Sequence, residues 1–213
     1  MPNSSRPAPP SNTTQPIEGA IINELYYTGQ GDPRHKCVAI GYHRNEPVVY
    51  KFDTVDLPQG TRTTVTFNEQ SVVAFFDWAL ATHLGSVIKG AEREPMTSLV
   101  MPGSTETFVH PPTLPDVASR SHFVRTSARM FSSGRDGEEK FEWRRIGDKH
   151  PYGYELFSLD PESRIARYDP TPRELPRIGR AYALLEYGFH EDNLIRDALL
   201  ALCLNRWIDW RGM

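Results

Sequence analysis

The last part of the chain, residues 191–213, carries the strongest helical signal in the sequence. At its centre lies a run of seven apolar residues, 198–204, which follows Arg196 and Asp197. In a helix of about 3.6 residues per turn, seven consecutive side chains point in every direction, so no side of this part of the helix is suited to water. The pattern predicts a C-terminal helix that the rest of the fold encloses.

The residues before this helix show the pattern of short β-strands. Clusters of β-branched and aromatic residues are separated by turns rich in Gly, Pro, Asn and Asp. Between residues 61 and 67, for example, Thr63, Val65 and Phe67 share one face of a strand and polar residues share the other. The first half of the chain predicts strands over residues 20–27, 37–42, 48–52, 61–67, 71–79 and 84–89.

One of these segments has an alternative interpretation. Val72, Phe75, Phe76 and Ala79 also fit a helical period, so a helix over residues 70–82 competes with the strand. β-branched and aromatic residues dominate the segment, and this composition favours the strand.

The second half continues the strand pattern with clearer turns. Residues 132–137 predict a turn and residues 170–176 a loop. The predicted strands cover residues 121–126, 139–146, 154–158, 164–168 and 179–187. Between the two halves lies an irregular, Pro-rich insertion at about residues 91–120, in which residues 99–101 fit one short strand.

Together these segments predict a mainly β fold with about twelve strands and one helix. A barrel of about eight strands has room only for side chains, whereas one of about eleven or twelve has room for a helix roughly 10 Å across. We therefore expect a closed or nearly closed antiparallel barrel of about twelve strands around the C-terminal hydrophobic helix. Residues 18–213 then form one domain, and residues 1–17, rich in Pro, Ser, Asn and Thr, form a disordered tail.

Composition narrows the class of protein. The chain has 213 residues and a formal net charge of −3, so its overall charge does not favour nucleic acid or an anionic membrane. Its two cysteines, Cys37 and Cys203, do not suggest a disulfide framework. The N-terminus lacks the apolar core of a signal peptide, and an apolar run of seven residues is far shorter than the roughly 20 that cross a bilayer. We expect an intracellular monomer without a transmembrane segment, either cytoplasmic, membrane-peripheral or nuclear.

Two patterns carry catalytic or metal-binding residue types. His35, Cys37 and His43 include zinc-ligand types, but their spacing is not that of a standard structural site. His190 is followed by two acidic residues, a combination used in general acid–base catalysis. We expect no metal and no cofactor.

The acidic residues after His190 have a structural explanation as well. Asp192 or Asn193 fits the cap of the C-terminal helix, and Glu191 lies at its positive end. The chain has no Gly-rich phosphate loop, no nucleophile elbow and no His-Glu-x-x-His motif. We therefore expect a protein that is not an enzyme.

The second half of the chain and its final helix resemble a known family. The resemblance rests on Phe123, Gly134-Arg135-Asp136-Gly137, Phe141-Glu142-Trp143-Arg144, Tyr154-Glu155-Leu156, Ile165-Ala166-Arg167-Tyr168, Gly179-Arg180-Ala181 and the apolar helix. This order resembles a fungal domain family of unknown function, which is similar to the tubby-like superfamily of tubby C-terminal domains, LURP-one proteins and phospholipid scramblases. It covers about residues 20–210 and implies a closed barrel of about twelve strands threaded by a C-terminal helix.

Basic residues gather on the predicted strand 139–146 and beside it, where they form a local positive cluster of the kind that binds phosphates. The candidate residues for an anionic headgroup, with one from the first half, are Lys89, Arg125, Arg135, Lys140, Arg144 and Arg145. Glu138, Glu139 and Glu142 largely offset this charge, so from the residues alone we favour a solvated surface over a headgroup site. Since tubby domains bind phosphoinositide headgroups, the resemblance implies that this one also does.

The end of the helix offers a further candidate site. Trp207 and Trp210 either plug the mouth of the barrel or anchor a partner or membrane interface, and we favour the plug. We expect a non-catalytic binding or adaptor domain whose partner is a phosphoinositide or a protein. The alternatives are a barrel that binds a small apolar ligand inside and an enzyme without a recognisable motif. A helix that fills the barrel would leave no internal cavity for the apolar ligand.

Overall fold

The computed structural model describes residues 22–79, 83–104, 128–134, 139–147 and 149–211. Within these ranges the chain is mainly β, as predicted, and ends in one long helix, α1 (Asp192–Arg211). The strands are β1 (Asn23–Tyr27), β2 (Cys37–His43), β3 (Glu46–Leu57), β4 (Gly60–Phe67), β5 (Ser71–Trp78), β6 (Ser86–Lys89), β7 (Glu92–Pro95), β8 (Met101–Pro102), β9 (Ala128–Ser133), β10 (Glu139–Ile146), β11 (Gly153–Leu159), β12 (Glu162–Asp169), β13 (Arg173–Leu175), β14 (Gly179–Ala181) and β15 (Ala183–Tyr187).

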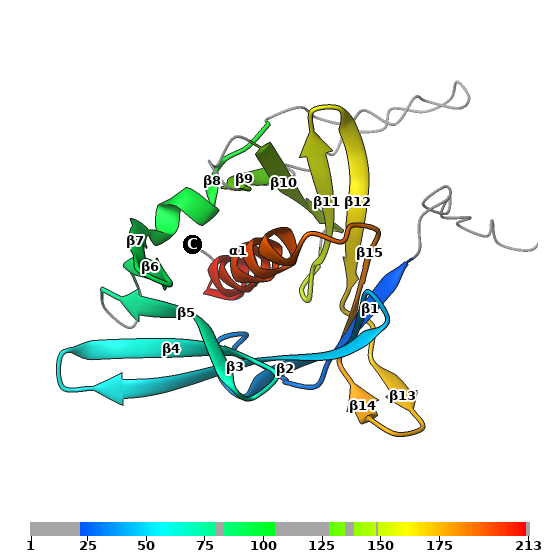
Figure 1. The fold of residues 1–213 in the computed structure, drawn as a ribbon, viewed down its shortest axis with the longest axis horizontal. Helices are drawn as coiled ribbons and strands as arrows, with labels where there is room; N and C mark the ends of the chain where they lie inside the picture. Colours follow the sequence, from blue (N-terminus) through cyan, green and yellow to red (C-terminus); the bar gives the residue numbers. More distant parts are fainter. Residues whose placement is uncertain (1–21, 80–82, 105–127, 135–138, 148, 212–213) are drawn as a thin grey trace, which may run out of the picture.

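One large antiparallel sheet wraps around α1 (Figure 1). It contains thirteen strands in the order β7-β6-β5-β4-β3-β2-β1-β15-β12-β11-β10-β9-β8. Most neighbours are consecutive in the chain, so hairpins build the two halves of the sheet. The pairing of β1 with β15 joins the first half to the second.

We expected a closed or nearly closed barrel, and the described part of this sheet is not closed by strand pairing. Its edges are β7 and β8, and the short 3₁₀ helix η1 (Met96–Leu99) connects them along the chain (Figure 1). Each edge strand ends in a proline, Pro95 or Pro102, and proline has no N–H to continue a hydrogen-bonded ladder. Met96 and Leu99 are instead buried in the core that surrounds α1.

The helix α1 is enclosed, as its sequence predicts. All seven residues of the apolar run 198–204 are buried, and Leu200 is 1% exposed. The indole N–H of Trp143, on β10, donates a hydrogen bond of 3.2 Å to the carbonyl oxygen of Ala198. Leucines from the helix and aromatic side chains from the strands form one hydrophobic core. Full burial of a leucine side chain contributes about 1.5–3 kcal/mol, so this core is a main source of stability.

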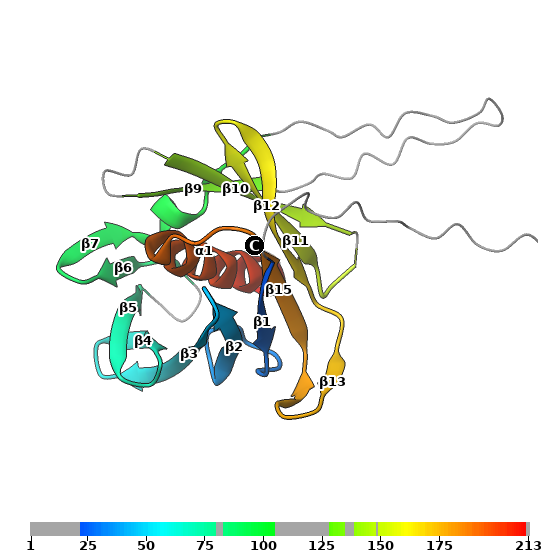
Figure 2. The same ribbon diagram turned by 45° about the vertical axis from the view of Figure 1, so that its right-hand side comes forward.

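Several predicted elements can be compared directly with the structure. The segment around residue 75 is the strand β5, so the helical alternative over residues 70–82 is wrong for its described residues. The loop predicted over residues 170–176 is wrong for residues 173–175, which form β13 and pair with β14 in a hairpin that projects away from α1 (Figures 1 and 2). The strand predicted over residues 179–187 is divided at Tyr182, whose N–H donates to the carbonyl of Tyr27 at 2.7 Å.

The Pro-rich insertion is more regular than its sequence suggests. Residues 91–104 contain β7, η1 and β8, and these elements provide both edges of the sheet. The rest of the insertion, the predicted strand at residues 121–126 and the tail at residues 1–17 lie outside the described residues. Pro95 and Pro102 therefore mark where strand pairing stops, not where the ordered fold stops.

Candidate ligand pocket at the C-terminal end of α1

The six residues predicted for an anionic headgroup do not form one site in the structure. Arg125 and Arg135 lie outside the described residues. Lys140, Arg144 and Arg145 are on β10, and Lys140 is exposed at its start. Three of the four described residues contact carboxylates, and this reduces the positive charge that they offer to a headgroup.

Arg144 and Lys89 show this pairing most clearly. Arg144 Nε lies 2.5 Å from Glu142 Oε1, and Arg144 Nη2 lies 2.8 Å from Glu162 Oε1. Lys89 Nζ lies 2.9 Å from Glu94 Oε1 and 3.8 Å from Asp197 Oδ1. Both basic side chains are only 11% exposed, so these ion pairs belong to the fold.

The residues of the zinc-like pattern are directed to separate partners. His35 Nδ1 lies 3.6 Å from Asp53 Oδ1, and Cys37 is buried. The ring of His43 contacts the Tyr187 hydroxyl and an Asp192 oxygen, each at 3.1 Å. Among the described residues, no group of three or more His, Cys, Asp and Glu side chains is arranged to hold a metal ion.

The start of α1 is tied to the first half of the sheet through Asp192. Besides its contact with His43, Asp192 lies 3.6 Å from Arg44 Nη1, in the turn that joins β2 to β3. A carboxylate in the first turn of a helix also interacts favourably with the positive end of the helix dipole. This arrangement accounts for one acidic residue after His190 without a catalytic role.

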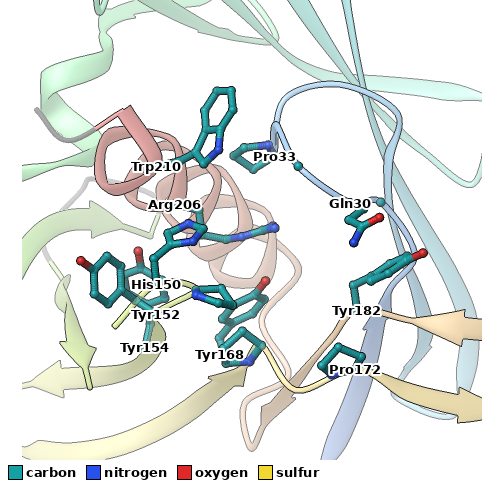
Figure 3. Close-up of a pocket in the computed structure, with 14 residues that line it drawn as sticks. Gln30, Pro33, His150, Tyr152, Tyr154, Tyr168, Pro172, Tyr182, Arg206 and Trp210 are labelled. Atoms are coloured by element: carbon teal, nitrogen blue, oxygen red, sulfur yellow. The ribbon is translucent and has the colours of Figure 1, made fainter. Parts of the chain in front are cut away.

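A pocket of about 260 Å³ lies at the other end of α1 (Figure 3). Side chains and backbone from five parts of the chain surround it. They come from the β1–β2 loop, the β10–β11 turn, strands β11 and β12, the residues around the β13–β14 hairpin, and the last turns of α1. The lining residues are Gly29, Gln30, Gly31, Pro33, His150, Pro151, Tyr152, Tyr154, Tyr168, Pro170, Pro172, Tyr182, Arg206 and Trp210.

The helix brings a cation and an aromatic ring into the pocket together. Arg206 and Trp210 are four residues apart, so they lie on the same side of α1. Figure 3 shows Arg206 extending from the helix between Tyr168 on one side and Gln30 and Tyr182 on the other. Trp210 is 41% exposed and lies at the rim of the pocket.

In the described part of the chain, the groups around Arg206 are aromatic rings and not carboxylates. Its guanidinium carbon lies 5.2 Å from the ring centre of Tyr27 and 5.0 Å from that of Tyr168. Its Nη1 lies 4.0 Å from the sulfur of Cys37. Among the residues that the structure describes, Arg206 forms no ion pair with Asp or Glu.

The ionisable groups of the pocket have displaced pKa values. Burial disfavours the charged form of Arg206, but Tyr168 and Cys37 act in the opposite direction, and the net result is a raised pKa. Burial also raises the pKa of Tyr168 to about 12, against the opposing effect of the Arg206 charge. At neutral pH the pocket therefore presents a guanidinium cation and a neutral tyrosine hydroxyl, and both can donate hydrogen bonds.

The carboxylate of Asp209, nearby on α1, already has other partners. Its two oxygens accept hydrogen bonds from Arg129 Nη2 at 2.9 Å and from the Tyr154 hydroxyl at 2.8 Å. Arg145 Nη1 lies 3.7 Å from the same carboxylate. Asp209 is thus shared by two arginines, and Arg206 is additional positive charge at this end of the helix.

Of the two tryptophans that we expected to plug the mouth of the barrel, one is buried and one is exposed. Trp207 is fully buried, 4.5 Å from the ring centre of Trp78 and beneath Arg34. Trp210 instead lines the pocket. The sequence analysis did not identify Arg206 as a site residue, although a basic residue two positions after an apolar run that must be enclosed is a usable signal.

Comparison of the chain with protein-family models, curated proteins and solved structures finds no match. None of the described helices combines the length and the apolar character needed to cross a membrane.

Proposed function

We propose that this protein is a non-catalytic binding domain that holds a small ligand in the pocket at the C-terminal end of α1. The observation that carries this proposal is a cavity of about 260 Å³ lined mainly by tyrosine, tryptophan, proline and glycine residues, with Arg206, Gln30 and His150 as further polar groups. Ligand pockets are concave and mostly apolar, with a few polar groups that orient the ligand. This volume is slightly below the range of about 300–1,000 Å³ that is typical of such pockets, so it favours a small ligand.

In this proposal the wrapped sheet acts as a tubby-like barrel in which η1 replaces the last strand contact. The position of η1 between β7 and β8 supports it, as does the burial of Met96 and Leu99 against the core. The resemblance of the second half of the sequence to the tubby-like superfamily is a separate, sequence-based argument for the same architecture.

The position of the pocket also bears on the apolar-ligand alternative. Buried side chains of α1 occupy the space inside the sheet, which leaves the helix end as the place for a ligand. A ligand there would contact the last turn of α1 and the loops around it. It would not enter the hydrophobic core.

A fragment screen by ¹H–¹⁵N NMR tests the proposal. Small aromatic compounds, both neutral and charged, are added to the labelled protein, and shifts are mapped onto the assigned backbone and onto the indole N–H of Trp210. The proposal expects shifts at Gly29, Tyr152, Tyr182 and Trp210. Binding that maps elsewhere, or no binding across the screen, would reject the pocket as the functional site. The exposed Val72 serves as an internal reference whose signal should not move.

Association with phosphoinositide-bearing membranes, which the resemblance implies, stays a second prediction. Co-sedimentation with vesicles, with and without phosphoinositides, tests it at low and at high salt. Pelleting that requires the phosphoinositide and is lost at high salt would support a headgroup site. Lack of pelleting at low salt would remove the membrane hypothesis and leave the pocket proposal in place.

A further inference from the structure

Arg206 distinguishes the pocket from the other places where a cation is enclosed by this fold. Arg34, Lys89 and Arg129 each lie within 3 Å of a carboxylate oxygen and are at most 14% exposed. Arg206 is half-buried and, among the described residues, forms no such pair. Removing a charge from water is unfavourable unless a partner compensates it, so Arg206 lacks the partner that these three cations have.

The tyrosine rings around Arg206 compensate its charge only in part. Contacts with the faces of Tyr27 and Tyr168 attract the cation, but they do not provide the lone pairs that guanidinium N–H groups prefer. Cys37, at 4.0 Å, is a weak acceptor, and burial raises the pKa of its thiol, so it is neutral at neutral pH. The N–H groups of Arg206 therefore remain available to a better acceptor.

The other residues that line the pocket indicate the chemistry of the uncharged part of the ligand. Pro33, Pro172, Tyr152 and Trp210 present apolar or aromatic surface around the guanidinium (Figure 3). The forked N–H groups of arginine match the paired oxygens of a carboxylate or a phosphate. A compact molecule with a flat apolar body and one oxyanion satisfies both parts of the site.

We propose that the pocket binds a small organic oxyanion, a carboxylate or a phosphate monoester, whose charged group pairs with Arg206 and whose apolar body lies against the aromatic and proline walls. This inference rests on the proposed function of the pocket and specifies its ligand class. Arg206 is the residue that distinguishes an anion from a neutral molecule of the same shape.

Calorimetric titration with three probes tests the inference: benzoate, phenyl phosphate and benzamide, the neutral counterpart of benzoate. Hydrogen bonds to charged groups contribute about 1.5–3 kcal/mol, so at least one anion should bind roughly 10- to 100-fold more tightly than benzamide. Which anion is preferred separates carboxylates from phosphate monoesters. Raising the salt concentration should weaken anion binding and leave benzamide binding unchanged.

Substitutions assign the discrimination to Arg206. Arg206→Met should remove the preference for the anion. Arg206→Lys should retain part of the preference, because lysine keeps the positive charge but lacks the paired N–H donors of the guanidinium group. Arg62→Met is the matched control: Arg62 also lies over an aromatic ring, that of Phe75 at 5.0 Å, but neither residue lines the pocket. It should bind the anion as the wild type does.

The failures of the two proposals are distinguishable. Equal affinity for benzoate, phenyl phosphate and benzamide, with shifts in the pocket, would overturn the oxyanion inference and leave the binding function standing. No binding of any probe would overturn both. If Arg206→Met does not fold, the comparison of anions with benzamide on the wild-type protein decides the question alone.

Discussion

Two half-buried arginines of this protein lie among aromatic rings and differ in their counter-ions. Arg144, on β10, lies 4.0 Å from the ring centre of Phe157 and forms ion pairs with Glu142 and Glu162. Arg206, on α1, lies about 5 Å from the ring centres of two tyrosines and, among the described residues, pairs with no carboxylate. Both have pKa values above that of an ordinary arginine, so both are charged at neutral pH.

The difference separates a cation that is paired within the fold from one that we propose binds a ligand. Arg144 was a candidate for headgroup binding because it lies in a basic segment, but its charge is used within the fold. Arg206 was not a candidate, yet it lines a pocket and keeps N–H groups available. A basic residue is therefore better judged by its carboxylate neighbours in space than by the charge of its own segment.

The largest expected effect comes from disrupting the hydrophobic core around α1, on which the positions of both arginines depend. Leu200→Asp places a carboxylate where the side chain is 1% exposed and no cation is provided. We expect loss of soluble, folded protein, measured by soluble yield and circular dichroism. Val72→Asp is the control, because Val72 is 51% exposed and the change should be tolerated. A soluble Leu200→Asp variant that unfolds cooperatively would contradict the enclosed helix.

The second-largest expected effect concerns the ion pair between Arg144 and Glu142. Arg144→Met leaves the fully buried Glu142 without its arginine, and breaking a buried ion pair costs about 3–5 kcal/mol. We expect a loss near the lower end, about 3 kcal/mol, because Ser104 N and Oγ still donate to Glu142. Urea unfolding at pH 7 measures it. A change below about 1 kcal/mol would mean that the pair is not structural.

Acidic pH should weaken the interactions of Glu142 with Arg144 and Ser104. Although burial alone would raise the pKa of Glu142, hydrogen bonds from Ser104 and Arg144 hold it below its ordinary value. A carboxyl group with a lowered folded-state pKa contributes stability above its unfolded-state pKa of about 4.3, and this contribution is lost as the pH falls through the folded-state value.

We therefore expect Glu142→Gln to lower stability at pH 7 by about 1–3 kcal/mol and to reduce the loss of stability below about pH 4. Urea titrations at pH 7, 5, 4 and 3 measure both effects. Glu46→Gln, at the exposed start of β3, should follow the wild-type curve. An acid profile of Glu142→Gln that is parallel to the wild type would exclude this residue as the source.

The smallest expected effect concerns Arg206 and tests the other side of the comparison. Without ligand, Arg206→Met loses contacts with two tyrosine rings, worth about 0.5–2 kcal/mol each, but relieves an uncompensated charge. The net change in unfolding free energy should stay within about 1 kcal/mol. A loss near 3 kcal/mol in the same urea assay would give Arg206 a structural role like that of Arg144.

Much of the fold could be predicted because its signals are local. The alternation in residues 61–67 and the apolar run in residues 198–204 each determine how a segment must be buried, whatever its neighbours are. That strand pairing leaves the described part of the sheet open could not be predicted in this way. It depends on which strands become the edges of one sheet, and these are β7 and β8, which end in Pro95 and Pro102.

The pocket could not be predicted from the sequence for a similar reason. Its walls come from segments as far apart in sequence as Gly29, Tyr152 and Trp210, and no local pattern reports that these meet. The basic cluster of β10 was visible in sequence, but the pairing of Arg144 with Glu162, across to β12, was not.

By itself, the sequence determined that the C-terminal helix must be enclosed by a β structure, since hydrophobic periodicity follows from positions along one segment. Only the tertiary structure decided which arginine and lysine side chains form ion pairs with carboxylates. Ion pairing acts over a few ångströms between side chains from distant segments, and the same residue type becomes structural at Arg144 and available for binding at Arg206.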